Sequence, residues 1–100
     1  MVQATTPTFV LTLPEEVDLS QASNIYFTLR QKGVQINKTG DELVIDGQTV
    51  SVYLSQSETI SMQAGIAQLQ LNWTYANGAR ACSNIVSVPV SENLLKRVIA

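Results

Sequence analysis

The sequence contains no histidine and only one cysteine, Cys82. Without histidine the chain cannot form a Ser-His-Asp or Cys-His nucleophilic site or a His-ligated metal centre. One cysteine can form neither an internal disulfide nor a Cys-x-x-Cys site. The sequence also has no Ser-x-x-Lys motif and no glycine-rich phosphate loop. We therefore expect no catalytic residue and no cofactor, and we predict that the protein is not an enzyme.

Charged side chains are scarce as well, at 14% of the chain against roughly 25% in an average globular domain. Six Lys and Arg against eight Asp and Glu give a net charge of −2, which excludes a strongly basic nucleic-acid-binding protein. The acidic residues cluster at 15–18 and 41–46, with neither the spacing of a known calcium loop nor that of two facing carboxylates. We expect solvated loops there and no metal.

Long apolar runs are missing too. No stretch approaches the roughly 20 residues needed to cross a bilayer, so we expect no membrane association. The segment from Met1 to Pro7 has neither the basic start nor the apolar run of a secretory signal. With 100 residues, of which 45% are hydrophobic, the chain can bury one core. We predict a single domain over residues 1–100, with a flexible N-terminus at 1–6 and a C-terminal tail at 91–100.

What the sequence has in abundance is alternation of apolar and polar residues with a period of two, the signal of half-buried strands. It runs through residues 8–13, 24–30, 34–36, 43–45, 50–54, 67–74 and 83–90. Glycine-containing turns such as Asn77-Gly78 separate these segments and favour antiparallel neighbours. The pattern predicts an all-β, immunoglobulin-like antiparallel sandwich of about seven strands. Trp73 shares the parity of Leu69 and Leu71, so we expect its ring in the core and its indole N–H bonded near an edge.

Two segments break the alternation. Residues 56–63 are too polar for a core element and predict a short helical turn, capped by Ser57-Glu58 and ended by Gly65. Residues 91–100 predict a short C-terminal helix with Ser91 as N-cap and four apolar residues on one side. These four are Leu94, Leu95, Val98 and Ile99. Ten residues are too few for a helix that is stable alone, so this segment must pack on its own sandwich or on a neighbouring subunit. The alternative is a final strand or a terminus docked on its own domain.

Two tyrosines, Tyr26 and Tyr53, lie on the polar side of their strands and should point outward. Exposed aromatic rings on a sheet can stack on sugars or anchor a protein interface, or they can simply pack across strands. The other outward residues are polar but mostly uncharged, as a subunit packed within an assembly can tolerate. They include Thr28, Thr49, Ser51, Gln68, Gln70, Asn72 and Thr74. Cys82, at a strand start, is expected to be a small buried or half-buried hydrophobe.

The run from Leu54 to Ile60, with Gly65, Gln70, Trp73, Asn77-Gly78 and Asn93-Leu94-Leu95, resembles a known group of proteins. These are short β-sandwich proteins encoded among phage and prophage tail genes of Gram-positive bacteria. They are similar to the N-terminal domain of siphophage baseplate upper proteins. The likeness covers residues 7–95. The stalk and receptor-binding region of the baseplate proteins have no counterpart in these residues, so assembly rather than host recognition is the transferable role.

The resemblance implies a non-enzymatic structural subunit that docks into a tail or baseplate through its sheet surfaces. Its partners would be other tail proteins and further copies of itself in a homo-oligomer. It would be cytoplasmic during assembly and then part of the virion. The alternative is a carbohydrate-binding module that uses Tyr26 and Tyr53 as stacking platforms.

Overall fold

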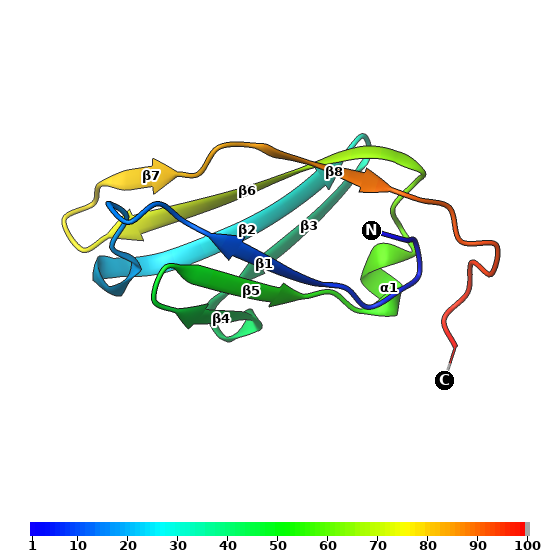
Figure 1. Cartoon of the computed structure of the whole chain (residues 1–100), viewed down its shortest axis with the longest axis horizontal. Helices are drawn as coiled ribbons and strands as arrows, with labels where there is room; N and C mark the ends of the chain where they lie inside the picture. The colour runs from blue at the N-terminus through cyan, green and yellow to red at the C-terminus, as the bar shows by residue number, and fades with distance from the viewer. Residues whose placement is uncertain (100) are drawn as a thin grey trace.

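Two antiparallel β-sheets face each other in the computed structural model, which describes residues 1–99 of the chain (Figure 1). The strands are β1 (Thr8–Thr12), β2 (Ala22–Gln31), β3 (Val34–Thr39), β4 (Leu43–Asp46), β5 (Thr49–Tyr53), β6 (Gly65–Tyr75), β7 (Arg80–Cys82) and β8 (Val86–Val90). Three short helical turns connect them: η1 (Leu19–Gln21), η2 (Gly40–Glu42) and α1 (Gln56–Thr59).

The strand order is that of an immunoglobulin sandwich. One sheet has three strands in the order β1-β5-β4, and the other has five in the order β3-β2-β6, with β7 and β8 both paired to the far edge of β6. These strands take the positions B-E-D and C′-C-F-G of the immunoglobulin fold. The predicted all-β sandwich is therefore confirmed. The last predicted strand, 83–90, is shorter than expected, and the three-residue β7 precedes it. With β7 the structure has eight strands within residues 1–99 instead of the seven expected. β7 was not predicted because three residues are too few to show an alternation of apolar and polar side chains.

The core lies between the inner faces of the two sheets. Phe27 and Leu29 of β2 and Val50 and Val52 of β5 are fully buried. The rings of Phe9 and Phe27 meet across the two sheets with centroids 6.1 Å apart. The alternation in the sequence thus placed most inward side chains correctly, because a strand turns successive residues to opposite faces.

Trp73 is 3% exposed, and its Nε1 donates to the Tyr75 hydroxyl at 2.8 Å. The prediction of a core indole whose N–H is satisfied is therefore confirmed. The loop after this strand spans residues 76–78, with Gly78 N–H donating to Tyr75 C=O at 3.0 Å and Tyr75 N–H to Ala79 C=O at 2.9 Å. Gly78 has φ +87, so it supplies the left-handed residue that a three-residue hairpin loop requires.

The helical turn α1 forms within the predicted segment 56–63, but its N-cap lies two residues earlier than expected. Ser55, not Ser57, is the N-cap: its Oγ accepts from Glu58 N–H at 3.3 Å, while Glu58 Oε1 accepts from Ser55 N–H at 2.9 Å. This reciprocal pair is a capping box, which satisfies two free N–H groups at once. Gly65 does not end the helix but starts β6. None of the helical segments within residues 1–99 has the length and hydrophobicity to span a membrane.

The predicted C-terminal helix is wrong, because residues 91–99 contain no helical turn. Ser91 forms an isolated parallel bridge with Val2 instead of an N-cap: its N–H donates to Met1 C=O at 2.7 Å, and its C=O accepts from Gln3 N–H at 3.0 Å. Asn93 Nδ2 adds a bond to Gln3 C=O at 2.9 Å. These long-range bonds commit the start of the segment to an extended conformation, and the residues after it are too few to nucleate a helix alone.

The N-terminal segment, expected to be flexible over residues 1–6, is held by the same contacts. The Met1 ammonium donates to Pro89 C=O at 2.8 Å. Gln3 is 7% exposed, and its Nε2 donates to Met62 C=O at 2.7 Å. This segment therefore closes one end of the sandwich.

Candidate interaction surfaces

The two tyrosines singled out in the sequence point away from the core, as predicted, but they do not meet. Tyr26 of β2 is 42% exposed and Tyr53 of β5 is 56% exposed, whereas their chain neighbours Phe27 and Val52 are fully buried. Each ring therefore lies on the outer face of its sheet. Since β2 and β5 belong to different sheets, the two rings face opposite sides of the sandwich and cannot stack on one ligand.

The outer face of the three-stranded sheet carries two exposed valines in its middle row and is nearly free of charge. We call it the valine face. The register places Val10, Ser51 and Val44 in one row across the sheet, with Val10 64% and Val44 65% exposed. Tyr53 lies beside Thr8 in the next row. The face comprises Thr8, Val10, Thr12, Val44, Asp46, Thr49, Ser51 and Tyr53, of which only Asp46 is charged.

Val10 and Val44 were not among the candidate residues from the sequence. The signal was present, because both valines occupy positions where the alternation calls for a polar residue. The two valines lie in one surface only because β1 and β4 both pair with β5. A local sequence pattern does not reveal that pairing.

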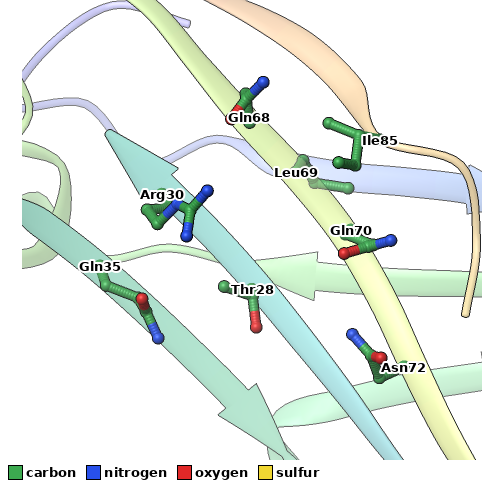
Figure 2. Close-up of a pocket in the computed structure, with 8 residues that line it drawn as sticks. All are labelled: Thr28, Arg30, Gln35, Gln68, Leu69, Gln70, Asn72 and Ile85. Carbon is green, nitrogen blue, oxygen red and sulfur yellow. The ribbon is translucent and has the colours of Figure 1, made fainter. Parts of the chain in front are cut away.

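The outer face of the five-stranded sheet is different, since its centre is covered by side-chain amides. We call it the amide face. Its amide side chains are Gln35, Asn37, Gln68, Gln70 and Asn72, flanked by Arg30 and Arg80. Figure 2 shows Gln35, Gln68, Gln70 and Asn72 together with Arg30. Asn37 Oδ1 accepts from Thr28 Oγ1 at 3.0 Å, and Asn72 Oδ1 accepts from Arg80 Nη2 at 3.0 Å. No acidic residue occupies an outward position of these strands.

Two shallow hollows mark the amide face. One, of about 240 Å³, lies along β6 between Arg30 and Ile85 (Figure 2). The other, of about 410 Å³, is bounded by Tyr26, Asn72 and Arg80. Most of their lining residues carry hydrogen-bond donors or acceptors, and the apolar exceptions are Leu69 and Ile85 in the first hollow and the Tyr26 ring in the second. The hollows therefore offer a polar ligand more hydrogen-bond partners than a hydrophobic one could use.

Glu58, whose pKa is lowered, serves the fold rather than either face. Burial raises the pKa of Glu58, but hydrogen bonds from Lys38 and Ser55 and the charge of Lys38 outweigh it, so the pKa lies below its ordinary value. Lys38 Nζ is 2.7 Å from Glu58 Oε2 and 3.6 Å from Glu42 Oε2. The ion pair between Lys38 of β3 and Glu58 of α1 therefore connects these two elements.

The four apolar residues proposed for the C-terminal helix are exposed, and no helix forms to bring them to one side. Their exposed fractions are 95% for Leu94, 48% for Leu95, 57% for Val98 and 50% for Ile99. The Gln56 side chain bonds both main-chain groups of Ile99 at 2.9 Å. Cys82 is exposed, so the expectation of a buried or half-buried thiol was wrong. Its side chain shares the outward parity of Asn72, its partner on β6.

No cluster of three or more His, Cys, Asp or Glu side chains that could hold a metal ion occurs in the described part of the chain. No protein-family model matches this chain, and no curated protein or solved structure is detectably similar to it.

Proposed function

We propose that this protein is a non-enzymatic assembly module of a phage or prophage tail or baseplate, and that it docks onto other tail proteins through the valine face. The observation that carries the proposal is the pair Val10 and Val44, which flank Ser51 on the two edge strands of a sheet with one charged outward residue and are each about two-thirds exposed. Solvated sheets usually carry Lys and Glu outward, which prevents association. The valine face carries no such protection.

The energetics favour the same use. Full burial of a valine side chain contributes about 1.5 kcal/mol or more, so covering the exposed two-thirds of Val10 or Val44 contributes about 1 kcal/mol each. Val10, Val44 and Tyr53 lie in adjacent rows. The surrounding Thr and Ser hydroxyls can donate and accept hydrogen bonds at the rim, as interfaces require. The phage context itself rests on the resemblance in residues 54–78 and 93–95. It implies that the protein is cytoplasmic before assembly and part of the virion afterwards.

The experiment is to induce particles from a lysogen that carries the gene, purify the tails and quantify this chain by mass spectrometry. We expect the wild-type chain in the tails and Val44→Asp absent from them. Ile66→Asp is the matched control, because Ile66 is 62% exposed on the outer face of the other sheet. Tails that lack the wild-type chain, or that incorporate Val44→Asp as well as Ile66→Asp, would contradict the proposal.

A second candidate function, carbohydrate binding, is supported by the amide face. The 410 Å³ hollow brings Tyr26 together with Asn37, Asn72 and Arg80. Such side chains can pair with sugar hydroxyls beside a stacking ring. Tyr53 has no part in this site. On a glycan array, Tyr26→Ala should abolish binding and Tyr53→Ala should not, and failure of the wild-type chain to bind any glycan would exclude this candidate.

A further inference from the structure

The sandwich is open along one side, between β1 and the chain from Cys82 to Val86. β1 pairs only with β5, and β7 and β8 pair only with β6, so each sheet ends there in a free edge. A groove of about 530 Å³ runs between the two edges. Leu11, Leu13 and Val17 line one wall, and Cys82 and Val86 line the other.

Val86 shows that the interior of the sandwich reaches the surface in this groove. It lies opposite Leu69, which is 2% exposed, and it shares the inward parity of Val88 and Val90. Those two valines are buried, whereas Val86 is 47% exposed. Its side chain faces inward and is still uncovered, because no strand of the three-stranded sheet extends over it.

The edge of β1 offers main-chain hydrogen bonds as well. Leu13 N–H donates to Gln48 C=O at 2.8 Å, and Pro7 C=O accepts from Leu54 N–H at 3.0 Å, so the odd-numbered residues of β1 bond to β5. In an antiparallel pair the alternate residues point the other way. The N–H and C=O groups of Thr8, Val10 and Thr12 therefore face the open side, where an extended segment can add to the sheet.

We propose that residues 94–99 of a second copy of this chain bind in the groove as an added strand. The proposal rests on the assembly function above and specifies how one copy joins the next. Residues 94–99 contain four exposed apolar side chains and neither glycine nor proline. These apolar side chains can cover Val86, which faces inward in the groove and is uncovered. The added segment would lie beside β1, at the position that strand A takes beside strand B in an immunoglobulin sheet.

The charges of the two surfaces are complementary. Three acidic residues, Glu15, Glu16 and Asp18, flank Val17 at the groove and form no salt bridge within residues 1–99. The added segment carries Lys96 and Arg97 between its apolar pairs. Lys96 pairs with Glu92 of its own copy at 3.0 Å, which leaves Arg97 to meet the acidic loop.

A second copy fits this role better than the same chain. In one molecule the segment leaves the sandwich beyond α1 (Figure 1), where Gln56 bonds Ile99. Gln56 lies just after the end of β5. The last residue of β5, Tyr53, pairs with the first residue of β1, Thr8, so Gln56 lies near the start of β1. The groove lies beside the opposite end of β1. The segment thus projects from one end of a copy, and the groove opens near the other end.

A thiol at position 86 provides the test, because the Val86 side chain faces the groove. Cys82, the only thiol in the chain, also lines the groove, but it shares the outward parity of Asn72. Cys82→Ser/Val86→Cys is mixed with Cys82→Ser/Leu95→Cys, whose thiol lies on the added segment, in a glutathione redox buffer. The mixed disulfide between the two copies is quantified by mass spectrometry. The matched control partner is Cys82→Ser/Ser57→Cys, which places an exposed thiol on α1. We expect the Leu95→Cys partner to cross-link about tenfold faster or more, because docked thiols reach millimolar effective concentrations against about 0.1 mM in bulk.

Charge reversal sharpens the result. Glu15→Lys/Glu16→Lys in the groove copy should slow the cross-link, and Lys96→Glu/Arg97→Glu in the segment copy should restore it. Equal rates for the two thiol partners would overturn the proposal. So would a Cys82→Ser/Val86→Cys/Leu95→Cys chain that closed its disulfide within one molecule. If tails incorporate the chain but the cross-link fails, the groove proposal is wrong and the assembly function stands. If the cross-link forms but tails do not incorporate the chain, the assembly function is wrong and docking of the segment in the groove stands.

Discussion

Removing one hydroxyl group, in Tyr75→Phe, should destabilise the sandwich measurably although Tyr75 itself is only half-buried. The Trp73 indole is 3% exposed, and its Nε1 donates to the Tyr75 hydroxyl at 2.8 Å. Without that oxygen the buried N–H has no partner. Leaving a buried donor unsatisfied costs about 1–3 kcal/mol.

The expected change in melting temperature follows from the size of the domain. For 100 residues the entropy of unfolding is about 0.21 kcal/mol/K, so a loss of about 1–3 kcal/mol lowers Tm by about 5–14 °C. Trp73→Ala should cost more, about 3–5 kcal/mol, because it also leaves a cavity. That is a large share of the roughly 5–15 kcal/mol that stabilises a domain of this length.

Thermal unfolding of Tyr75→Phe can be followed by tryptophan fluorescence, because Trp73 is the only tryptophan. Trp73→Ala removes that fluorophore, so its unfolding is followed by circular dichroism. Tyr53→Phe is the control, since Tyr53 is 56% exposed and its hydroxyl can bond to water. A surface change of this kind should stay within about 0.5 kcal/mol. If Tyr75→Phe melts like the Tyr53→Phe control, the indole has another partner and the reasoning is refuted.

Three further predictions concern local contacts. Glu58 has a lowered pKa in the fold, so its stabilising effect is present above its ordinary value of 4.5 and is lost as pH falls through the folded pKa. Chemical denaturation should therefore show Glu58→Gln less stable than wild type at pH 7 and the two converging in acid; a difference independent of pH would contradict this. Gly78→Val should cost about 1 kcal/mol or more, because Gly78 has φ +87 and valine disfavours that region; an unchanged Tm would argue against the turn. Truncation after Asn93 keeps the bonds to Gln3 and should leave a folded sandwich by circular dichroism, whereas truncation after Ser91 removes them and should melt earlier.

Much of the fold could be predicted from the sequence because the signals are local. Alternation over 67–74 identifies the inward side of β6 without reference to its partners, since a strand turns successive side chains to opposite faces. The Asn77-Gly78 turn and the helical turn near Glu58 are equally local. Even there the N-cap was misplaced, because Ser55 and Ser57 both precede Glu58 and only Ser55 stands three residues before it, as a capping box requires.

Where local patterns admit two structures, distant contacts decide between them. Residues 91–99 have the apolar spacing of a helix, but Met1 and Gln3, about 90 positions away, bind the main chain of Ser91 in an extended form. The same contacts hold residues 1–6, for which composition alone suggested flexibility. Hydrogen bonds between such remote residues leave no trace in the periodicity of either segment.

The sequence by itself determined which residues form most of the strands and which way most of their side chains point. Only the tertiary structure decided which strands share a sheet. That choice sends Tyr26 and Tyr53 to opposite faces, joins Val10 and Val44 into one surface and leaves Val86 uncovered at an open edge. The physical reason is that alternation records the environment of each strand separately, whereas an interaction surface depends on which strands pack side by side.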